Sequence, residues 1–281
     1  MIDICIIGTG NIGTDLLYKL LKLEYVNIVA FIGRRVNTKS LPANVKYSDK
    51  SIQYFITNPK CCDVVFDCTD AESAILNSKI FIAQGIKVID LTPSNIGTMY
   101  IPYITPITEY TNMVTCGGQA SIPLINFIYK QCSDIKYIEV VTQISADSAG
   151  IATRINIDKY IETTENAIYK LIGVKNSKVI LNVNPGKKII MKTTIYIKTK
   201  QFTINYLNLF IDGIKKYIPN YYLSPPVWSN NDVLMLHIQI VGSGDYISEY
   251  AGNLDVINCA SICALNEYNI LINNNNIKDI S

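Results

Sequence analysis

The chain has 281 residues, of which 49% are hydrophobic and 17% charged, a composition that excludes a disordered or fibrous protein. At roughly 150 residues per domain, this length predicts two domains, each large enough to bury its own core. The 25 basic and 23 acidic residues leave a net charge of +2, too balanced for a protein that binds nucleic acid through its phosphates, so we expect no nucleic-acid partner.

The first third alternates short apolar runs with helical patterns, as βαβ units of a parallel sheet do. Strands are expected over residues 2–8, 27–33, 63–68 and 86–91, and helices over residues 11–23 and 72–84. Residues 36–60 show no regular pattern. We therefore predict a dinucleotide-binding domain over residues 1–115, completed by residues 253–281 from the end of the chain.

Beyond about residue 133 the apolar residues alternate in longer runs, which predict an antiparallel or mixed sheet with one face covered by helices. The expected strands are 137–144, 188–198 and 233–241, and the expected helices are 158–173, 202–218 and 251–272. Residues 116–252 thus form a second α/β domain. The overall prediction is a two-domain α/β protein.

Neither a basic leader nor an apolar run of the ~20 residues needed to cross a membrane is visible, so we expect a cytoplasmic protein with no membrane partner. Its cysteines form no CxxC pair and no cluster with histidine, which predicts reduced thiols that mostly fill the core, and no metal site. The cysteines are Cys5, Cys61, Cys62, Cys68, Cys116, Cys132, Cys259 and Cys263.

A GxGxxG pattern follows the first predicted strand and opens the first predicted helix, in Gly8, Thr9, Gly10, Asn11, Ile12 and Gly13. Gly8 allows the tight turn, Gly10 lets a pyrophosphate approach the backbone, and Gly13 lets the helix pack on the strand. A glycine-rich turn that binds nothing is the alternative. The position after the strand favours dinucleotide binding.

Two arginines, Arg34 and Arg35, follow the second predicted strand, where an NAD site places an acidic residue for the ribose hydroxyls. Guanidinium groups match the oxygens of a 2′-phosphate, so the pair favours NADP over NAD. The alternative is a solvated turn with two surface charges.

Cys116 lies where a short apolar segment runs into Gly117 and Gly118 and then into a helical pattern with Pro123 in its first turn. A thiol at a helix N-terminus faces amide groups and the positive end of the dipole, which lower its pKa and favour a thiolate nucleophile. The same amides are expected to hold an oxyanion. The alternative is a buried structural cysteine, which we favour for the other seven.

Five segments, in the same order over most of the chain, resemble the acylating acetaldehyde dehydrogenases that accompany 4-hydroxy-2-oxovalerate aldolases. They are GTGNIGTDL (8–16), DLTPSNIG (90–97), NMVTCGGQASIP (112–123), SAGIATRINIDKYIETT (148–164) and YAGNLD (250–255). The resemblance implies a Rossmann domain and a second α/β catalytic and dimerisation domain of the glyceraldehyde-phosphate-dehydrogenase type. It also implies a homodimer, an aldolase partner, and interconversion of acyl-CoA and an aldehyde with NAD(P).

By the same resemblance, Cys116 is the nucleophile that forms an acyl thioester. Further nucleotide-site positions are implied at Ser148, Ala149, Gly150, Asn156 and Asn253, the last as a hydrogen-bond partner of the nicotinamide carboxamide.

Three departures from the family pattern limit what carries over. Thr193 replaces a carboxylate that is thought to assist proton movement, and Arg35 replaces an acidic residue, in agreement with NADP. Residues 218–236 are shorter than in the family and lack its glycine-rich segment, which implies a different acyl pocket and aldolase surface. A bulkier acyl-CoA or a carrier-protein thioester is a further hypothesis.

Two other functions stay open from the sequence alone. A phosphorylating or semialdehyde dehydrogenase needs an anion site near Cys116, for which Arg154, Lys187 and Lys188 are the candidates. A non-catalytic nucleotide-binding partner of an aldolase is the third possibility. The single histidine, His237, lies in an alternating run, and we interpret it as a structural residue rather than the catalytic base.

Overall fold

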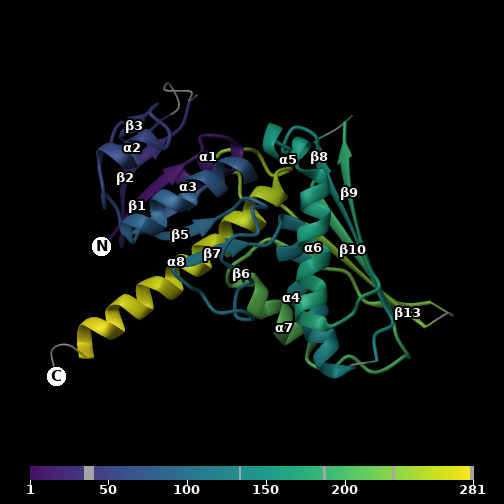
Figure 1. The fold of residues 1–281 in the computed structure, drawn as a ribbon. Helices are drawn as coiled ribbons and strands as arrows, with labels where there is room; N and C mark the ends of the chain where they lie inside the picture. The colour runs from purple at the N-terminus through teal and green to yellow at the C-terminus, as the bar shows by residue number, and fades with distance from the viewer. Residues whose placement is uncertain (35–40, 133, 186–187, 230–231, 279–281) are drawn as a thin grey trace. The chain divides into compact units, whose positions relative to one another are not determined.

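The structure is a computed structural model that describes residues 1–34, 41–132, 134–185, 188–229 and 232–278 (Figure 1). Contacts within the chain divide it into two compact units. Unit 1 comprises Met1–Met113 and Ala260–Ser281, and unit 2 comprises Val114–Cys259. None of the helices among the described residues combines the length and apolarity that a membrane span requires.

Unit 1 is built on a seven-stranded sheet in the order β3-β2-β1-β4-β5-β7-β6, with every neighbouring pair parallel. The strands are β1 (Ile2–Ile7), β2 (Val26–Ile32), β3 (Tyr47–Ser48), β4 (Val64–Asp67), β5 (Lys87–Asp90), β6 (Thr98–Tyr100) and β7 (Tyr110–Met113). The helices are α1 (Asn11–Leu20), α2 (Gln53–Thr57), α3 (Ala71–Gln84) and the part of α8 (Gly252–Lys278) from Ala260 onward. The predicted parallel sheet is confirmed, and its strand order reverses between β1 and β4, where ligands bind in such folds.

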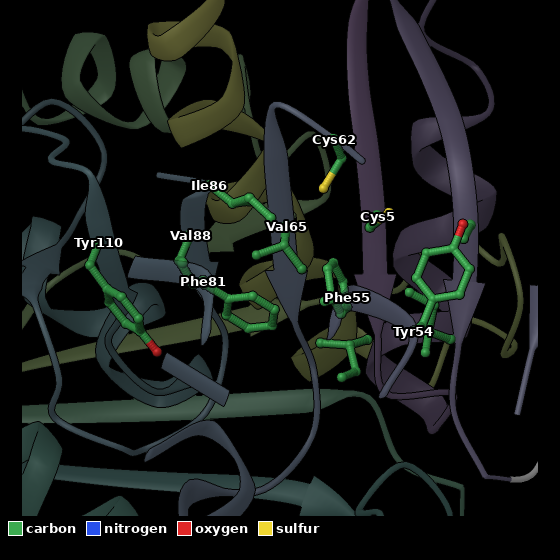
Figure 2. Close-up of a cluster of buried hydrophobic side chains, with 12 residues drawn as sticks. Cys5, Tyr54, Phe55, Cys62, Val65, Phe81, Ile86, Val88 and Tyr110 are labelled. Carbon is green, nitrogen blue, oxygen red and sulfur yellow. The ribbon is translucent and has the colours of Figure 1, made fainter. Parts of the chain in front are cut away.

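A buried hydrophobic cluster fixes α2 and α3 on one face of this sheet (Figure 2). Phe55 of α2 and Phe81 of α3 are fully buried and pack edge to face, with ring centroids 4.9 Å apart. Val65 and Val88, on β4 and β5, belong to the same cluster. Residues 36–60 gave no pattern because β3 and α2 are too short to show a period.

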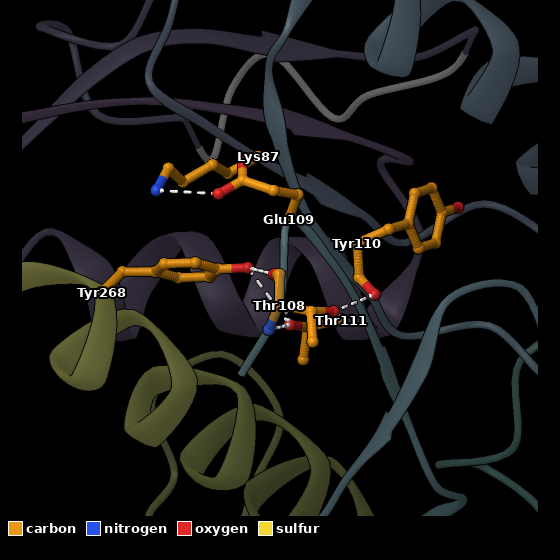
Figure 3. A network of polar contacts seen from close by, with 6 residues as sticks. All are labelled: Lys87, Thr108, Glu109, Tyr110, Thr111 and Tyr268. Carbon is orange, nitrogen blue, oxygen red and sulfur yellow. Dashed lines mark hydrogen bonds and ion pairs between the residues drawn. The ribbon is translucent and has the colours of Figure 1, made fainter. Parts of the chain in front are cut away.

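The C-terminal helix is tied to unit 1 by a polar network around Tyr268 (Figure 3). The Tyr268 hydroxyl contacts the carbonyl oxygen of Thr108 and lies 3.1 Å from Oγ1 of Thr111. Lys87 places its ammonium group 5.1 Å from the centre of the Tyr268 ring and pairs with Glu109 at 3.3 Å. The end of the chain thus helps to complete the unit that the first strand begins.

Unit 2 contains a mixed sheet in the order β11-β13-β10-β8-β9, with β12 paired to β13. The strands are β8 (Tyr137–Ser145), β9 (Ser177–Asn184), β10 (Met191–Lys198), β11 (Tyr221–Leu223), β12 (Val227–Trp228) and β13 (Val233–Ile240). The helices are α4 (Cys116–Gln131), α5 (Ile151–Ile155), α6 (Ile157–Ile172) and α7 (Leu207–Lys215). β8 and β9 are parallel and the other pairs antiparallel, so the predicted mixed sheet is confirmed.

Two details of unit 2 differ from the expectations. β9 was not predicted because it is an edge strand whose only buried side chain is that of Val179, so its sequence carries no clear alternation. Pro123 lies inside α4 rather than in its first turn, since the helix begins at Cys116, before the two glycines. The helix accommodates a proline whose ring removes one backbone donor.

Candidate functional site

The loop between β1 and α1 has the backbone geometry of a phosphate-binding turn. Gly8 has φ +106°, and a Cβ there would lie 2.4 Å from the Cys68 carbonyl group. A Cβ on Gly13 would lie 1.9 Å from the carbonyl oxygen of Gly8, so only glycine lets α1 approach the strand this closely. Both positions exclude any side chain.

The N-terminus of α1 is open where a dinucleotide would bind. Among the described residues, chain neighbours aside, no atom lies within 4 Å of a Cβ built on Gly10, and the first turn of α1 has no acidic residue. Backbone amides at such an end carry partial positive charge and suit a pyrophosphate. The residues present therefore fit a nicotinamide dinucleotide.

Of the two arginines proposed to select the cofactor, only Arg34 lies among the described residues. Arg34 directly follows Gly33 at the end of β2 and is exposed. A Cβ on Gly33 would lie 2.5 Å from the Thr9 side chain. The end of β2 therefore packs directly against the turn that leads from β1 into α1 (residues 8–13), which we call the glycine loop. Arg35 lies outside the described residues.

Two carboxylates that the sequence analysis missed lie at the ends of neighbouring strands in unit 1. Asp67 ends β4 and Asp90 ends β5, and both are fully buried. Each accepts a hydrogen bond from the backbone amide two residues later, Thr69 at 3.0 Å and Thr92 at 2.7 Å. The repeated Asp-x-Thr spacing after an apolar strand is the signal that could have identified these turns.

Burial raises the pKa of both carboxyl groups. The pKa of Asp90 reaches about 7, first because of burial and then because of the nearby charge of Asp67. Burial likewise raises the pKa of Asp67, against hydrogen bonds from Thr69 and Asn77. Asp90 is therefore close to its titration point at neutral pH, at the edge of the sheet where the glycine loop lies.

Cys116 is the first residue of α4, and its thiol is half-buried. Thr115 caps the helix by accepting a hydrogen bond from the Gly118 amide at 3.0 Å. The Tyr160 hydroxyl, from α6, lies 3.9 Å from Sγ of Cys116 and accepts a hydrogen bond from the Gly117 amide at 3.0 Å. A helix N-terminus and a phenol thus meet at the thiol.

One expectation about this helix end is wrong. Packing around the thiol raises the pKa of Cys116 to about 11, because burial outweighs the lowering by the Tyr160 hydrogen bond and by the backbone amides of Gly117 and Cys116. In the structure the thiol donates to the Tyr160 hydroxyl oxygen, which also accepts from the Gly117 amide. That the amides hold an oxyanion stays a prediction.

A chain of hydroxyl groups connects Cys116 to Thr193. The Tyr160 hydroxyl contacts Thr142 on β8, whose Oγ1 lies 3.1 Å from Oγ1 of Thr193 on β10. Thr115 and Thr164 contact each other at 2.6 Å beside this chain. Burial raises the pKa of Tyr160 well above its usual value, so its hydroxyl stays protonated and can donate. Tyr160 lies within the segment 148–164, but the sequence pattern alone assigned it no role.

His237 faces away from these groups. It pairs across the strands with Thr194, and its Nδ1 lies 3.0 Å from Oγ1 of Thr194. Successive residues of a strand point to opposite faces of the sheet, so Thr193, and with it the hydroxyl chain, lies on the other face. This geometry fits the structural role expected of His237.

The turn between β8 and α6 holds the other predicted nucleotide-site positions. Ser148 and Ala149 are buried, and the Ser148 hydroxyl donates to the Ser145 carbonyl at 2.8 Å. Gly150 precedes α5 with no atom within 4 Å of a built Cβ, and Asn156 precedes α6.

The anion site that a phosphate acceptor needs is not supported by the described residues. Arg154 donates through Nε to the Ala149 carbonyl at 3.2 Å and through Nη2 to the Ala146 carbonyl at 2.8 Å. It therefore braces the turn. Lys188 lies over the Tyr250 ring, with its nitrogen 5.3 Å from the ring centre, and Lys187 lies outside the described residues.

Asn253, in the first turn of α8, is buried with a side-chain oxygen that has no hydrogen-bond partner in the described part of the chain. A buried unpaired acceptor is costly, so a ligand that donates to it gains affinity. The carboxamide of nicotinamide is such a donor. Asn253 belongs to unit 2, as do Cys116 and the turn at Ser148, whereas the glycine loop belongs to unit 1.

Comparisons with known proteins agree with both units. The sequence profile of prokaryotic acetaldehyde dehydrogenase dimerisation domains matches residues 116–248, and that of semialdehyde dehydrogenase NAD-binding domains matches residues 3–107. The chain is 41% identical over 280 residues to an acetaldehyde dehydrogenase of Spirochaeta aurantia, covering 95% of this chain and 94% of that protein. It is 40% identical over 272 residues to an acetaldehyde dehydrogenase of Pectobacterium atrosepticum, covering 92% of each.

Solved structures show a similar fold at low sequence identity. Aspartate semialdehyde dehydrogenase II of Vibrio cholerae matches with a TM-score of 0.65 at 14% identity, covering 97% of this chain and 99% of that one. Aspartate semialdehyde dehydrogenase of Candida albicans, determined with NADP, matches with a TM-score of 0.59 at 13% identity, covering 94% and 99%. These likenesses confirm the predicted two-domain α/β fold.

Proposed function

The chain belongs to the acetaldehyde dehydrogenase family, and on that premise we propose that it interconverts an acyl-CoA and an aldehyde through a thioester on Cys116. It is accordingly an oxidoreductase that uses a nicotinamide cofactor. The observation that carries the assignment of the nucleophile is the position of Cys116 at the start of α4, 3.9 Å from a buried phenol.

The first step is acyl transfer to the enzyme. The Cys116 sulfur attacks the carbonyl carbon of the acyl-CoA, its proton is given up, and the bond between that carbon and the CoA sulfur breaks. Proton and CoA thiolate leave together as free CoA. The acyl group is then bound to Cys116 as a thioester.

The second step reduces that thioester. When bound, the nicotinamide supplies a hydride in this direction and accepts one in the reverse direction. The acyl carbon becomes the carbon of a thiohemiacetal, which releases the aldehyde as the bond to sulfur breaks and the thiol regains a proton. Asn253 would orient the nicotinamide through its unpaired side-chain oxygen.

Tyr160 takes the part of the missing carboxylate in this proposal. Its hydroxyl oxygen lies 3.9 Å from the sulfur and accepts from the resting thiol, and the raised pKa of Tyr160 keeps a proton available for donation once the sulfur is ionised. It stabilises the developing charge on sulfur, and Thr142 and Thr193 position it by hydrogen bonding. Thr193 itself touches neither sulfur nor phenol and acts as a positioning residue.

Cofactor choice and partners are finer proposals. We propose NADP over NAD, because Arg34 is exposed at the end of β2, next to the glycine loop, and can contact a 2′-phosphate. A homodimer is supported by the dimerisation profile that matches residues 116–248. An aldolase partner rests on the resemblance alone, and pull-down with the purified aldolase tests it.

A rate matrix tests the function directly. Acetyl-, propionyl- and an aromatic acyl-CoA are each assayed with NADH and NADPH, with Cys116→Ser alongside. Turnover with CoA esters that is lost in Cys116→Ser supports the proposal, and a mutant as fast as wild type overturns it. Phosphate supplied in place of CoA in the oxidative direction should give no acyl transfer, because Arg154 is occupied by the turn.

A further inference from the structure

Three cysteines of unit 1, none of which takes part in the proposed reaction, converge on one point. Cys5 comes from the middle of β1, and Cys61 and Cys62 from the turn just before β4. Their sulfur atoms all lie within 4.8 Å of one another, and those of Cys5 and Cys61 are 3.9 Å apart. The sequence analysis did not find this cluster, because 56 residues separate Cys5 from Cys61 and no spacing motif reveals the contact between them.

The three thiols differ in their access to solvent. Cys5 is fully buried and Cys62 is 8% exposed, and both belong to the hydrophobic cluster with Tyr54 and Phe55 (Figure 2). Cys61 is only half-buried and packs against the edge of this cluster. The trio is thus walled by apolar groups on one side and reachable from solvent on the other.

The donor set suits a soft cation. Three cysteine sulfurs from two separate segments converge within 4.8 Å of one another. Cysteine binds metals as the thiolate, and metal binding itself releases the thiol protons.

We propose that Cys5, Cys61 and Cys62 together bind one thiophilic d10 metal ion, with Zn²⁺ as the ion that suits three thiolates and a solvent ligand. Zinc–sulfur bonds of about 2.3 Å in a tetrahedron place neighbouring sulfurs about 3.8 Å apart, and Cys5 and Cys61 already stand at 3.9 Å. Water can enter the fourth position on the exposed side of Cys61.

Binding of Zn²⁺ displaces the thiol protons into solvent, so three thiolates and the dication carry a net charge of −1. Lys46 is the compensating cation. Its ammonium group lies 5.7 Å from the centre of the Tyr54 ring, and Tyr54 packs in the same cluster as Cys5 and Cys62.

The test uses the full-length protein, reduced and freed of metal. It is titrated first with Co²⁺ and then with Zn²⁺, and a chromophoric chelator that competes for the metal reports the affinity. We expect one tight equivalent, with the near-ultraviolet charge-transfer band and strong visible bands of tetrahedral cobalt thiolate, both lost when Zn²⁺ displaces Co²⁺. Cys61→Ser, at a half-exposed position that tolerates a hydroxyl, should lower the affinity at least ~10-fold and weaken the charge-transfer band. Cys62→Ala provides a second variant without a new polar group.

Two controls separate this site from other thiols. Cys132→Ser removes a half-buried cysteine of unit 2 that contacts only Thr199 at 3.1 Å in the described hydrogen bonds, and it should bind Co²⁺ as wild type does. Cys116→Ser should also keep the band. The proposal is overturned if the reduced protein gives no charge-transfer band, if Cys61→Ser keeps it unchanged, or if Cys116→Ser abolishes it. A Cys5–Cys61 disulfide that reforms under metal-loading conditions, seen by mass spectrometry, would also overturn it.

Discussion

The hydroxyl of Tyr160 lies 3.9 Å from the sulfur of Cys116 and at the same time accepts a hydrogen bond of 3.0 Å from the Gly117 amide. This arrangement changes the usual account of a cysteine at a helix N-terminus. The Gly117 amide both holds the phenol in place and, with the Cys116 amide, bonds the sulfur. A side chain on α6 therefore shapes the reactivity of a thiol on α4.

Replacing this phenol should slow the enzyme without unfolding it. Tyr160→Phe removes the hydrogen bond that lowers the pKa of Cys116, so we expect kcat to fall ~10-fold or more and the thiol to become harder to ionise. Wild-type alkylation by iodoacetamide should rise about tenfold per pH unit from pH 7 to 9, because the pKa of Cys116 is about 11, and the mutant should react more slowly throughout. Tyr169→Phe, exposed on the same helix, is the control and should change neither rate.

A glycine next to Cys116 is expected to be indispensable. A Cβ on Gly117 would lie 2.1 Å from the Tyr160 hydroxyl oxygen and 2.7 Å from Oγ1 of Thr142. Gly117→Ala should therefore cost ~1–3 kcal/mol of stability and most of the activity. Gly213→Ala, in a helix where the Cβ meets nothing within 4 Å, should instead stabilise by ~0.5–1 kcal/mol. Thermal unfolding compares the two, and equal effects would contradict the geometry.

Stability should fall with rising pH because of Asp90. Its pKa is about 7 in the folded protein and about 3.9 in the unfolded chain. A carboxyl group whose pKa rises on folding contributes its full stability below the pKa that it has in the unfolded chain. This contribution is lost as the pH rises through the pKa that it has in the folded protein. The loss amounts to up to ~1.4 kcal/mol per pH unit between about pH 4 and 7. Asp90→Asn should therefore raise Tm at pH 8 much more than at pH 5. An equal shift of Tm at both pH values in Asp90→Asn would refute the assignment.

The glycine loop allows cofactor binding and folding to be separated. Gly10→Ala adds a methyl group into open space, so stability should stay within ~0.5 kcal/mol of wild type while the Kd for NADPH rises at least ~10-fold. Gly13→Ala should destabilise instead, since its Cβ would meet the Gly8 carbonyl at 1.9 Å. Calorimetric titration and thermal unfolding give the two readouts. Unchanged NADPH affinity in Gly10→Ala would show that the pyrophosphate lies elsewhere.

The elements with strong periodicity were predictable and those set by tertiary contacts were not. The strands β1, β2 and β4 each carry an apolar run over most of their length, so their positions followed from the sequence. β9, an edge strand with one buried side chain, carries too little pattern to find.

The residues of the candidate site divide in the same way, into those that lie in local motifs and those that tertiary contacts bring in. Gly8 and Cys116 lie in local motifs, whereas Tyr160 reaches the thiol from a helix 44 residues away. The pKa of Cys116 was misjudged for a related reason, because the helix end is visible in the sequence but the burial around the sulfur is not.

The division of unit 1 between the two ends of the chain has a consequence for folding during synthesis. Its sheet is complete by Met113, yet the helix that buries Tyr268 against Thr108 and Thr111 is translated last, after all of unit 2. A nascent chain therefore exposes the apolar surface beneath α8 until the residues from Ala260 onward have been made. This segment of α8 sets the moment at which the sheet of unit 1, made earlier, gains its full set of contacts.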